Sequence, residues 1–346
     1  MDVSTNAPAN TGFPAGPPPG IPLPVSKTIA PSDNSTSTVL TVPDTAAQIA
    51  PTEAGLTFHA GIPYSSRTMA DGSVRQLTLD IFTHTADSAP KPLVVYVSGG
   101  GFMLSIKESA RLQRAYLAEA GFVVASIDYT ALTHGPGATF NDGVADVKSA
   151  IRFLRANAAE YGIDPARIAV WGESAGGYLA AMAGATSGSA EFDSGDNAGV
   201  SSDVQAVVDN FGASALAYIA ADFDDEAKAF WTAPNAPVAM YVHGPAGGAL
   251  DPTDPTLIKA DPATYLSSAT PPFLLFHGDA DTLMSPSQTL LLHNALRASG
   301  VPSTRFVLDG ANHGDAPFLG DPEVGRVWST TTAMDLIVEF LRAELR

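Results

Sequence analysis

The sequence contains no cysteine, and charged residues make up only 16% of its 346 residues. The lack of cysteine excludes disulfide bridges, thiolate metal sites and a cysteine nucleophile. Basic residues are the scarcer charge: 18 Lys and Arg stand against 36 Asp and Glu, which gives a net charge of −18. A surface of this sign repels phosphate backbones and anionic lipid, so we expect no nucleic-acid partner and favour neutral ligands.

Long apolar runs are also missing, since no stretch approaches the roughly 18 residues that a membrane span needs. The first basic residue is Lys27, so the N-terminus shows no secretory signal with a basic region followed by an apolar one. We therefore expect a soluble protein that is either cytoplasmic or the mature form of a secreted one. The sequence leaves open whether the protein forms a homodimer. Apolar residues make up 45% of the chain, which is ample for a large core.

Residues 1–50 differ in composition from the rest, because Pro, Gly, Ser and Thr dominate them. Such a segment has too little apolar surface to offset the entropy lost on ordering. We predict an extended arm or linker there, with a Pro-rich docking peptide as the alternative. Residues 51–346 are predicted to form one folded domain.

From residue 56 onward, short apolar runs alternate with helical periodicity. Several runs, such as LVVYV and FLLF, are continuously apolar, as expected for strands of a parallel sheet that are covered on both faces. The alternation predicts an α/β fold with a mostly parallel, eight-stranded, doubly wound sheet. The eight expected strands are Thr57–Tyr64, Gln76–Phe82, Pro92–Ser98, Val123–Tyr129, Arg167–Gly172, Val204–Phe211, Phe273–His277 and Thr304–Leu308.

Residues 213–270 interrupt this alternation with a stretch rich in Pro and Gly that includes Trp231. The stretch lies between the sixth and seventh expected strands. An insertion there would overhang the C-terminal edge of the sheet, where α/β folds bind ligands. We interpret it as a small lid.

The strongest local motif is Gly172-Glu173-Ser174-Ala175-Gly176, which fits G-x-S-x-G. It follows an expected strand and opens an expected helix over residues 178–185. This is the setting of a nucleophile elbow, where a sharp turn presents the serine hydroxyl at the edge of the sheet. A glycine-rich turn without catalysis is the alternative.

A second glycine motif, Ser98-Gly99-Gly100-Gly101-Phe102, ends the strand PLVVYV. Backbone amides brought together by such a loop can stabilise the oxyanion of acyl transfer. A phosphate-binding loop is excluded, because no lysine follows in a G-K-[ST] context. Taken alone, a structural glycine turn would explain the motif equally well, but its pairing with the elbow favours an oxyanion loop.

A base and an acid must follow the seventh strand, because this fold orders them after the serine. Of the seven histidines only His293 and His313 lie there, and His293 falls inside an expected helix over residues 286–298. His313 is in a loop, so we predict that it is the base. Asp279 and Asp281 both follow the strand FLLF, and spacing alone leaves the choice between them open. No pair among the other histidines has zinc-ligand spacing.

Four ordered motifs, GESAGG preceded by IDPARIAVWG, SGGGF, HGDAD and NHG, resemble those of bacterial α/β-hydrolase esterases and lipases. These are relatives of hormone-sensitive lipase and of the feruloyl-esterase-like group. The resemblance covers about residues 75–345 apart from the insertion, and it implies an α/β-hydrolase fold for the catalytic domain. It also implies Asp281 as the acid, with oxyanion amides from Gly100, Gly101 and Ala175. In the family a histidine precedes the three glycines, whereas this chain has Ser98, which bears on the rigidity of the loop.

The resemblance implies a serine carboxylesterase that acts on small to medium neutral esters, with no metal or organic cofactor. An amidase, formamidase or peptidase using the same triad is the nearest alternative, and a non-catalytic binding protein on this fold is a further one. Phe102, Met103, Trp231 and Met284 are candidate walls of the substrate pocket. For each of the four, ordinary core packing is the competing interpretation.

Overall fold

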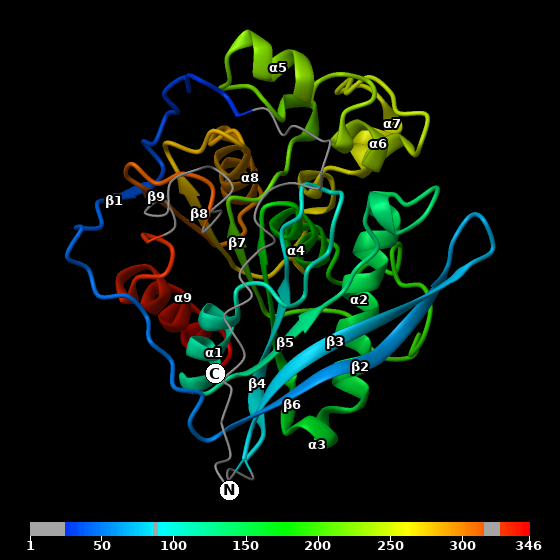
Figure 1. The fold of residues 1–346 in the computed structure, drawn as a ribbon, viewed down its shortest axis with the longest axis vertical. Helices are drawn as coiled ribbons and strands as arrows, with labels where there is room; N and C mark the ends of the chain where they lie inside the picture. The colour runs from blue at the N-terminus through cyan, green and yellow to red at the C-terminus, as the bar shows by residue number, and fades with distance from the viewer. Residues whose placement is uncertain (1–24, 86–88, 315–325) are drawn as a thin grey trace, which may run out of the picture.

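A nine-stranded sheet runs through the molecule with helices on both of its faces (Figure 1). The computed structural model describes residues 25–85, 89–314 and 326–346. The strand order is β1-β9-β8-β7-β6-β4-β5-β3-β2, and only the pairs β5–β3 and β3–β2 are antiparallel. The strands are β1 (Thr38–Leu40), β2 (Leu56–Thr68), β3 (Val74–His84), β4 (Lys91–Val97), β5 (Val123–Ile127), β6 (Ile163–Glu173), β7 (Ala206–Asn210), β8 (Phe273–Gly278) and β9 (Ser303–Leu308).

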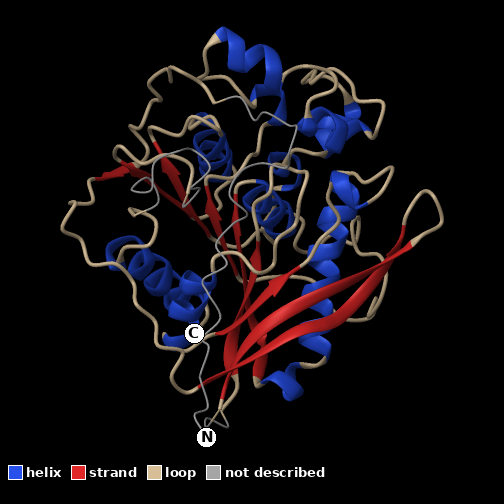
Figure 2. Ribbon diagram, in the orientation of Figure 1, coloured by secondary structure: helices blue, strands red, loops and turns tan. Residues whose placement is uncertain are grey.

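The helices divide between the two faces of this sheet, and Figure 2 shows the two sets on either side of the strands. Side chains of α2, α4 and α8 join one buried cluster with the sheet, while those of α1 and α9 join a second cluster. The doubly wound, mostly parallel α/β sheet predicted from the sequence is therefore confirmed. These helices are α1 (Arg111–Glu119), α2 (Phe140–Ala156), α4 (Ala175–Ala185), α8 (Ser287–Ala298) and α9 (Thr331–Glu344), and the four-residue α3 (Ala158–Tyr161) follows α2.

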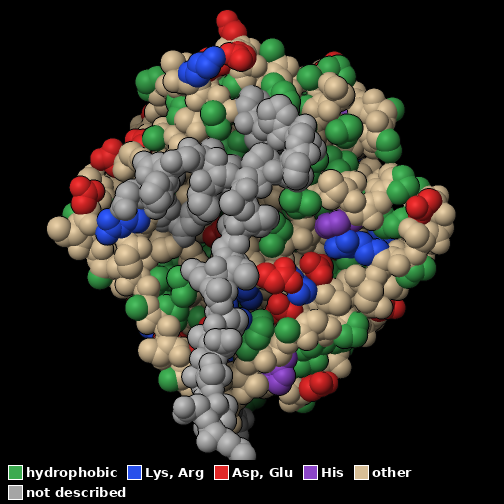
Figure 3. All heavy atoms as spheres, in the orientation of Figure 1, with side chains coloured by type: hydrophobic (Ala, Val, Ile, Leu, Met, Phe, Trp, Pro, Cys, Tyr) green, Lys and Arg blue, Asp and Glu red, His purple; other side chains and the backbone are tan. Residues whose placement is uncertain are grey.

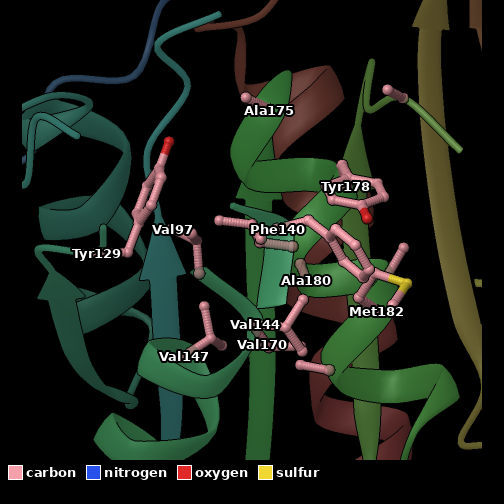
Figure 4. Close-up of a cluster of buried hydrophobic side chains, with 14 of the residues drawn as sticks. Val97, Tyr129, Phe140, Val144, Val147, Val170, Ala175, Tyr178, Ala180 and Met182 are labelled. Carbon is pink, nitrogen blue, oxygen red and sulfur yellow. The ribbon is translucent and has the colours of Figure 1, made fainter. Parts of the chain in front are cut away.

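The central strands are apolar along their whole length because both of their faces are covered. In Figure 4, Val97 of β4 and Val170 of β6 lie in one cluster with Val144 of α2 and Ala180 of α4. Each of these four side chains is fully buried. Burial on both faces holds the C-terminal ends of β4 and β6 side by side, and the two glycine motifs follow those ends.

The N-terminal segment attaches to the far edge of the sheet, where it is the dark blue chain at the left of Figure 1. Thr38–Leu40 forms β1 and pairs in parallel with β9, which makes it the ninth strand that the sequence analysis missed. Ile29 bridges to Phe223, and the side chain of Ile49 is buried. Residues 25–50 therefore lie against the domain, held by these backbone contacts and by side-chain bonds such as that from the Ser26 hydroxyl to Oδ2 of Asp224 at 3.0 Å. Their interpretation as an extended arm or linker stays a prediction. Residues 1–24 lie outside the described residues.

The predicted insertion lies between β7 and β8 and holds three short helices at the top of Figure 1: α5 (Asp225–Trp231), α6 (Pro237–His243) and α7 (Pro255–Lys259). Two tyrosines tie it to the core. Tyr178 of α4 donates its hydroxyl hydrogen to the carbonyl of Ala260 at 2.8 Å, and Tyr241 of α6 donates to the carbonyl of Thr130 at 3.0 Å. The insertion therefore rests on the helix that begins at the elbow, and its role as a lid stays a prediction.

Trp231, one of the candidate walls of the substrate pocket, has only 3% of its surface accessible and belongs to the main core cluster. We expect Trp231→Ala to lower the free energy of unfolding by about 3–5 kcal/mol, since it deletes a buried aromatic side chain. Denaturant unfolding would measure this loss, and rates on acetyl, butyryl and octanoyl esters would test the pocket role. Unchanged stability with an altered ranking of chain lengths would contradict the packing role.

Charged side chains are sparse on the surface. On the part of the face in Figure 3 that described residues form, Lys and Arg side chains stand apart from one another. Within the described ranges, no helix has both the length and the apolar character required to cross a bilayer.

Candidate active site

The chain turns sharply at Ser174, between the end of β6 and the start of α4. Ser174 has a φ of 54° and a ψ of −122°, a strained conformation for a residue with a side chain. A Cβ at Gly172 would lie 2.1 Å from the carbonyl oxygen of Gly176, and one at Gly176 would lie 2.1 Å from that of Val97. The turn therefore requires glycine at both flanking positions, which is why G-x-S-x-G is its sequence signature.

Ser174, His313 and Asp281 form one continuous row of hydrogen bonds. The Ser174 Oγ lies 2.9 Å from Nε2 of His313, and the His313 Nδ1 lies 2.7 Å from Oδ2 of Asp281. The three residues are 8%, 5% and 0% exposed, respectively, so little water competes for these bonds. With Nδ1–H donating to the carboxylate, Nε2 is left as the acceptor for the serine hydroxyl.

The carboxylate of Asp281 is held at both oxygens. Its Oδ1 accepts the amides of Leu283 at 2.9 Å and Met284 at 2.8 Å. Burial alone would raise the pKa of Asp281, but His313 and His277 outweigh it and hold this pKa below its ordinary range. Asp281 is therefore charged at neutral pH. The structure places Asp281, rather than Asp279, against His313, whereas Asp279 is exposed and accepts the amide of Gly310 at 2.7 Å.

One aromatic ring packs against His313, and two further side chains support its loop. Phe211, which follows β7, meets it edge-on with ring centroids 4.6 Å apart. Asn312 accepts the amide of Thr282 at 3.1 Å and thereby links the histidine loop to the loop of Asp281. Trp328 donates its indole N–H to the carbonyl of Asn312 at 3.0 Å. No sequence pattern predicted these supports, although Asn312 is part of the NHG motif.

The glycine loop after β4 lies directly against the nucleophile, since a Cβ at Gly99 would come within 3.2 Å of the Ser174 Cβ. A Cβ at Gly100 would meet the carbonyl oxygen of Leu104 at 2.1 Å, and Gly101 has a φ of 59°. Among the described residues, no acceptor pairs with the amides of Gly100, Gly101 and Ala175. Free amides beside a serine hydroxyl are the donors that an oxyanion requires.

Ser98 and Tyr129 hold this loop in place. The Ser98 hydroxyl accepts the amide of Ile106 at 2.8 Å. The buried Tyr129 hydroxyl lies 3.0 Å from the carbonyls of both Ser98 and Leu104, one at each end of the glycines. The serine that replaces the histidine of related sequences therefore still fastens the loop.

The expected pocket residues are mostly engaged in packing. Phe102 is buried between the rings of Tyr178 and Tyr241, with centroids 5.8 and 5.3 Å away. Met103 and Met284 are also largely buried, and the backbone of Met284 serves Asp281. Contact of these side chains with a substrate stays a prediction. Across the described part of the chain, no group of three or more His, Asp or Glu residues could hold a metal ion.

A buried carboxyl that the sequence analysis did not single out lies beneath the first turn of α4. Asp209 of β7 is paired in register with Gly172, and a Cβ at Gly177 would lie 2.3 Å from its Oδ1. That oxygen accepts the amide of Gly212 at 2.9 Å, while Oδ2 has no partner among the described residues. Burial raises the pKa of Asp209 from its ordinary 3.8 to about 7.

We expect Asp209 to make stability fall as pH rises. Between pH 4 and 7 the folded state keeps a proton that the unfolded state has lost, so folding is favoured at the lower pH. The gap between 3.8 and about 7 corresponds to roughly 4 kcal/mol. Urea unfolding at pH 4.5 and 8 should therefore show Asp209→Asn gaining stability over the wild type as pH rises. A difference that does not change with pH would contradict the assignment.

A nucleophile elbow after a central parallel strand, with acid and histidine on later loops, is the architecture of α/β-hydrolases. The chain belongs to the BD-FAE family, an esterase family of this fold, because the family model matches residues 79–296. This confirms the fold and the family resemblance seen in the four motifs.

Named relatives and solved structures agree with this membership. A probable isoprenylcysteine α-carbonyl methylesterase (ICMEL1) of Arabidopsis thaliana is 28% identical over 77% of this chain and 54% of that protein. Esterase LipQ of Mycobacterium tuberculosis is 30% identical over 69% of this chain and 54% of its own length. A truncated carbohydrate esterase from gut microbiota superposes with a TM-score of 0.68 at 25% identity, covering 85% of this chain and 98% of that one. The chain thus spans little more than half the length of the curated relatives it matches.

Proposed function

We propose that the chain is a serine carboxylesterase that hydrolyses small to medium neutral esters through an acyl-enzyme. In this proposal Ser174 is the nucleophile, His313 is the base, and Asp281 is the acidic member of the triad, whose carboxylate orients His313. The observation that carries the proposal is the hydrogen-bonded row from the Asp281 carboxylate through His313 to Ser174 at a strained elbow. The names of the relatives, which are esterases and methylesterases, support ester chemistry.

In the proposed mechanism the Ser174 hydroxyl gives its proton to Nε2 of His313 as its oxygen attacks the ester carbonyl. The amides of Gly100, Gly101 and Ala175 receive the oxyanion that forms. The charged His313, balanced by Asp281, then protonates the departing alcohol. Water repeats the cycle on the acyl-enzyme and releases the acid.

The proposed acyl groups are short-chain, acetyl or aryl. A neutral substrate suits a protein with a net charge of −18, because anionic esters would be repelled. The same charge supports our prediction that nucleic acid is not a partner. A cytoplasmic or secreted location and a homodimer stay predictions.

Two measurements test the proposal. A fluorophosphonate reagent should label the wild-type chain at Ser174, whereas a non-catalytic binding protein would stay unlabelled. A panel of esters with acyl chains of increasing length should then be hydrolysed faster than amides that match them in acyl group. Faster hydrolysis of the amides would replace the esterase by an amidase that uses the same triad.

A further inference from the structure

A second buried histidine contacts the carboxylate of the proposed triad. His277, at the end of β8, is fully buried. Its Nε2 lies 3.2 Å from Oδ2 of Asp281, the oxygen that also faces His313, and 3.1 Å from the carbonyl oxygen of Met284. Its Nδ1 lies 2.8 Å from Oγ1 of Thr289 on α8. The mechanism above gives His277 no role.

The neighbours of His277 determine where its proton resides. Both partners of Nε2 are acceptors: a backbone carbonyl and an ionised carboxylate. Nε2 must therefore carry a hydrogen. The charged groups that act on this ring are Asp281 and Arg305, and burial, the largest influence, lowers the pKa of His277 below its ordinary value. A neutral ring protonated at Nε2 leaves Nδ1 as an acceptor for the Thr289 hydroxyl.

Arg305 of β9 orients that hydroxyl. Its Nε donates to Oγ1 of Thr289 at 3.0 Å, and a guanidinium can only donate. The hydroxyl hydrogen of Thr289 is therefore directed to His277. Burial lowers the pKa of Arg305 to about 10, which still leaves it charged at neutral pH.

The N-terminal segment closes the far end of this row. Arg305 is almost fully buried and donates through Nη1 to Oδ1 of Asn34 at 3.0 Å and to Oγ of Ser37 at 2.9 Å. Its Nη2 donates to the carbonyl of Pro286 at 2.9 Å. Among the described residues, no carboxylate forms an ion pair with Arg305. Its hydrogen bonds to neutral groups, two of them on the segment just before β1, are thus what hold it in place.

We propose that His277 is a positioning residue for the triad, and that Arg305, Thr289 and His277 form a one-directional row of donors that ends on Oδ2 of Asp281. The row extends the hydrogen bonds of the proposed active site, so its effect on catalysis rests on the proposed function. With Oδ1 held by two amides and Oδ2 by His277, the carboxylate cannot rotate away from His313.

The tautomer of His277 can be measured without reference to activity. In the full chain labelled with ¹⁵N-histidine, NMR at pH 7.5 should show His277 neutral and protonated at Nε2, with assignment from the His277→Gln variant. Protonation at Nδ1, or a charged imidazolium, would overturn the proposal whatever the enzyme hydrolyses.

The effect on catalysis is tested by a matched pair of variants. His277→Leu removes the donor, whereas His277→Gln places a carboxamide N–H close to the position of Nε2. We expect the Leu variant to lose about tenfold in kcat with KM unchanged, the equivalent of one hydrogen bond to a charged group. The Gln variant should recover most of kcat.

Equal losses of kcat in both variants, or a lowered melting temperature with unchanged kcat, would show that His277 is only a structural residue. If His277→Leu does not fold, Thr289→Val and Thr289→Ser test the same row of hydrogen bonds at its next residue. Valine removes the hydroxyl and serine keeps it, so equal kcat values in these two variants would overturn the proposal. Failure of the proposed function is distinguishable, because wild-type protein would then show neither fluorophosphonate labelling nor ester turnover.

Discussion

Replacing Ser174 by alanine is expected to lower kcat on esters by about 10⁴-fold or more, because loss of a triad member removes the nucleophile and leaves only binding and the oxyanion donors. The fold should persist. The Ser174 side chain makes one hydrogen bond, to His313, while its backbone amide donates to Asn210 at 2.9 Å and stays in place in the variant.

Steady-state kinetics, fluorophosphonate labelling and a melting curve on Ser174→Ala would measure this effect. Ser268→Ala is a suitable control, since Ser268 is an exposed serine of the insertion. The control should keep wild-type kcat and labelling. A tenth of wild-type activity in Ser174→Ala protein free of wild-type enzyme would refute Ser174 as the nucleophile.

Asp281→Asn is expected to cost on the order of 10⁴-fold in kcat, as the same change does in other Ser-His-Asp triads. An asparagine side chain presents either an N–H donor or a neutral carbonyl to Nδ1 of His313. The imidazole then no longer prefers the tautomer that is protonated at Nδ1, and the negative charge that stabilised the protonated imidazolium is gone. The side-chain carbonyl oxygen of asparagine can still accept the two backbone amides that now donate to Oδ1 of Asp281. The loop should therefore stay folded.

Asp279→Asn provides the matched control two residues away. Its Oδ1 accepts the amide of Gly310 and an asparagine oxygen can replace it, so kcat should stay within a few-fold of the wild type. Kinetics of the two variants on one ester would compare them directly. If Asp279→Asn were the more damaging change, the assignment of the acid would be wrong.

Local patterns in the sequence were enough to predict eight of the nine strands and their order along the chain. All eight expected strands appear. In the central strands, such as β5, β7 and β8, a continuously apolar run reports burial on both faces, whereas most of β2 is exposed or half-buried. The glycines around Ser174 were equally readable, since the elbow excludes a Cβ at Gly172 and Gly176. Such features depend on a few neighbouring residues and therefore leave a signature in the sequence.

Spacing did not decide between Asp279 and Asp281, because both follow the same strand by a few residues. The family resemblance implied Asp281, and the folded loops show that Asp279 turns to Gly310 and Asp281 to His313. The attachment of β1 was similarly hidden. Its three residues pair with β9 through backbone groups, which are common to every sequence.

The sequence by itself determined the fold, the elbow, the glycine loop and the histidine that follows the last strand. Tertiary structure alone decided the burial of Trp231 and the row from Arg305 through Thr289 and His277 to Asp281. The physical reason is the distance along the chain over which each kind of feature acts. Periodicity and turn chemistry act over a few residues, whereas this row joins β9, α8 and β8 to the N-terminal segment. Those side chains meet only because the order of strands in the sheet brings their ends together.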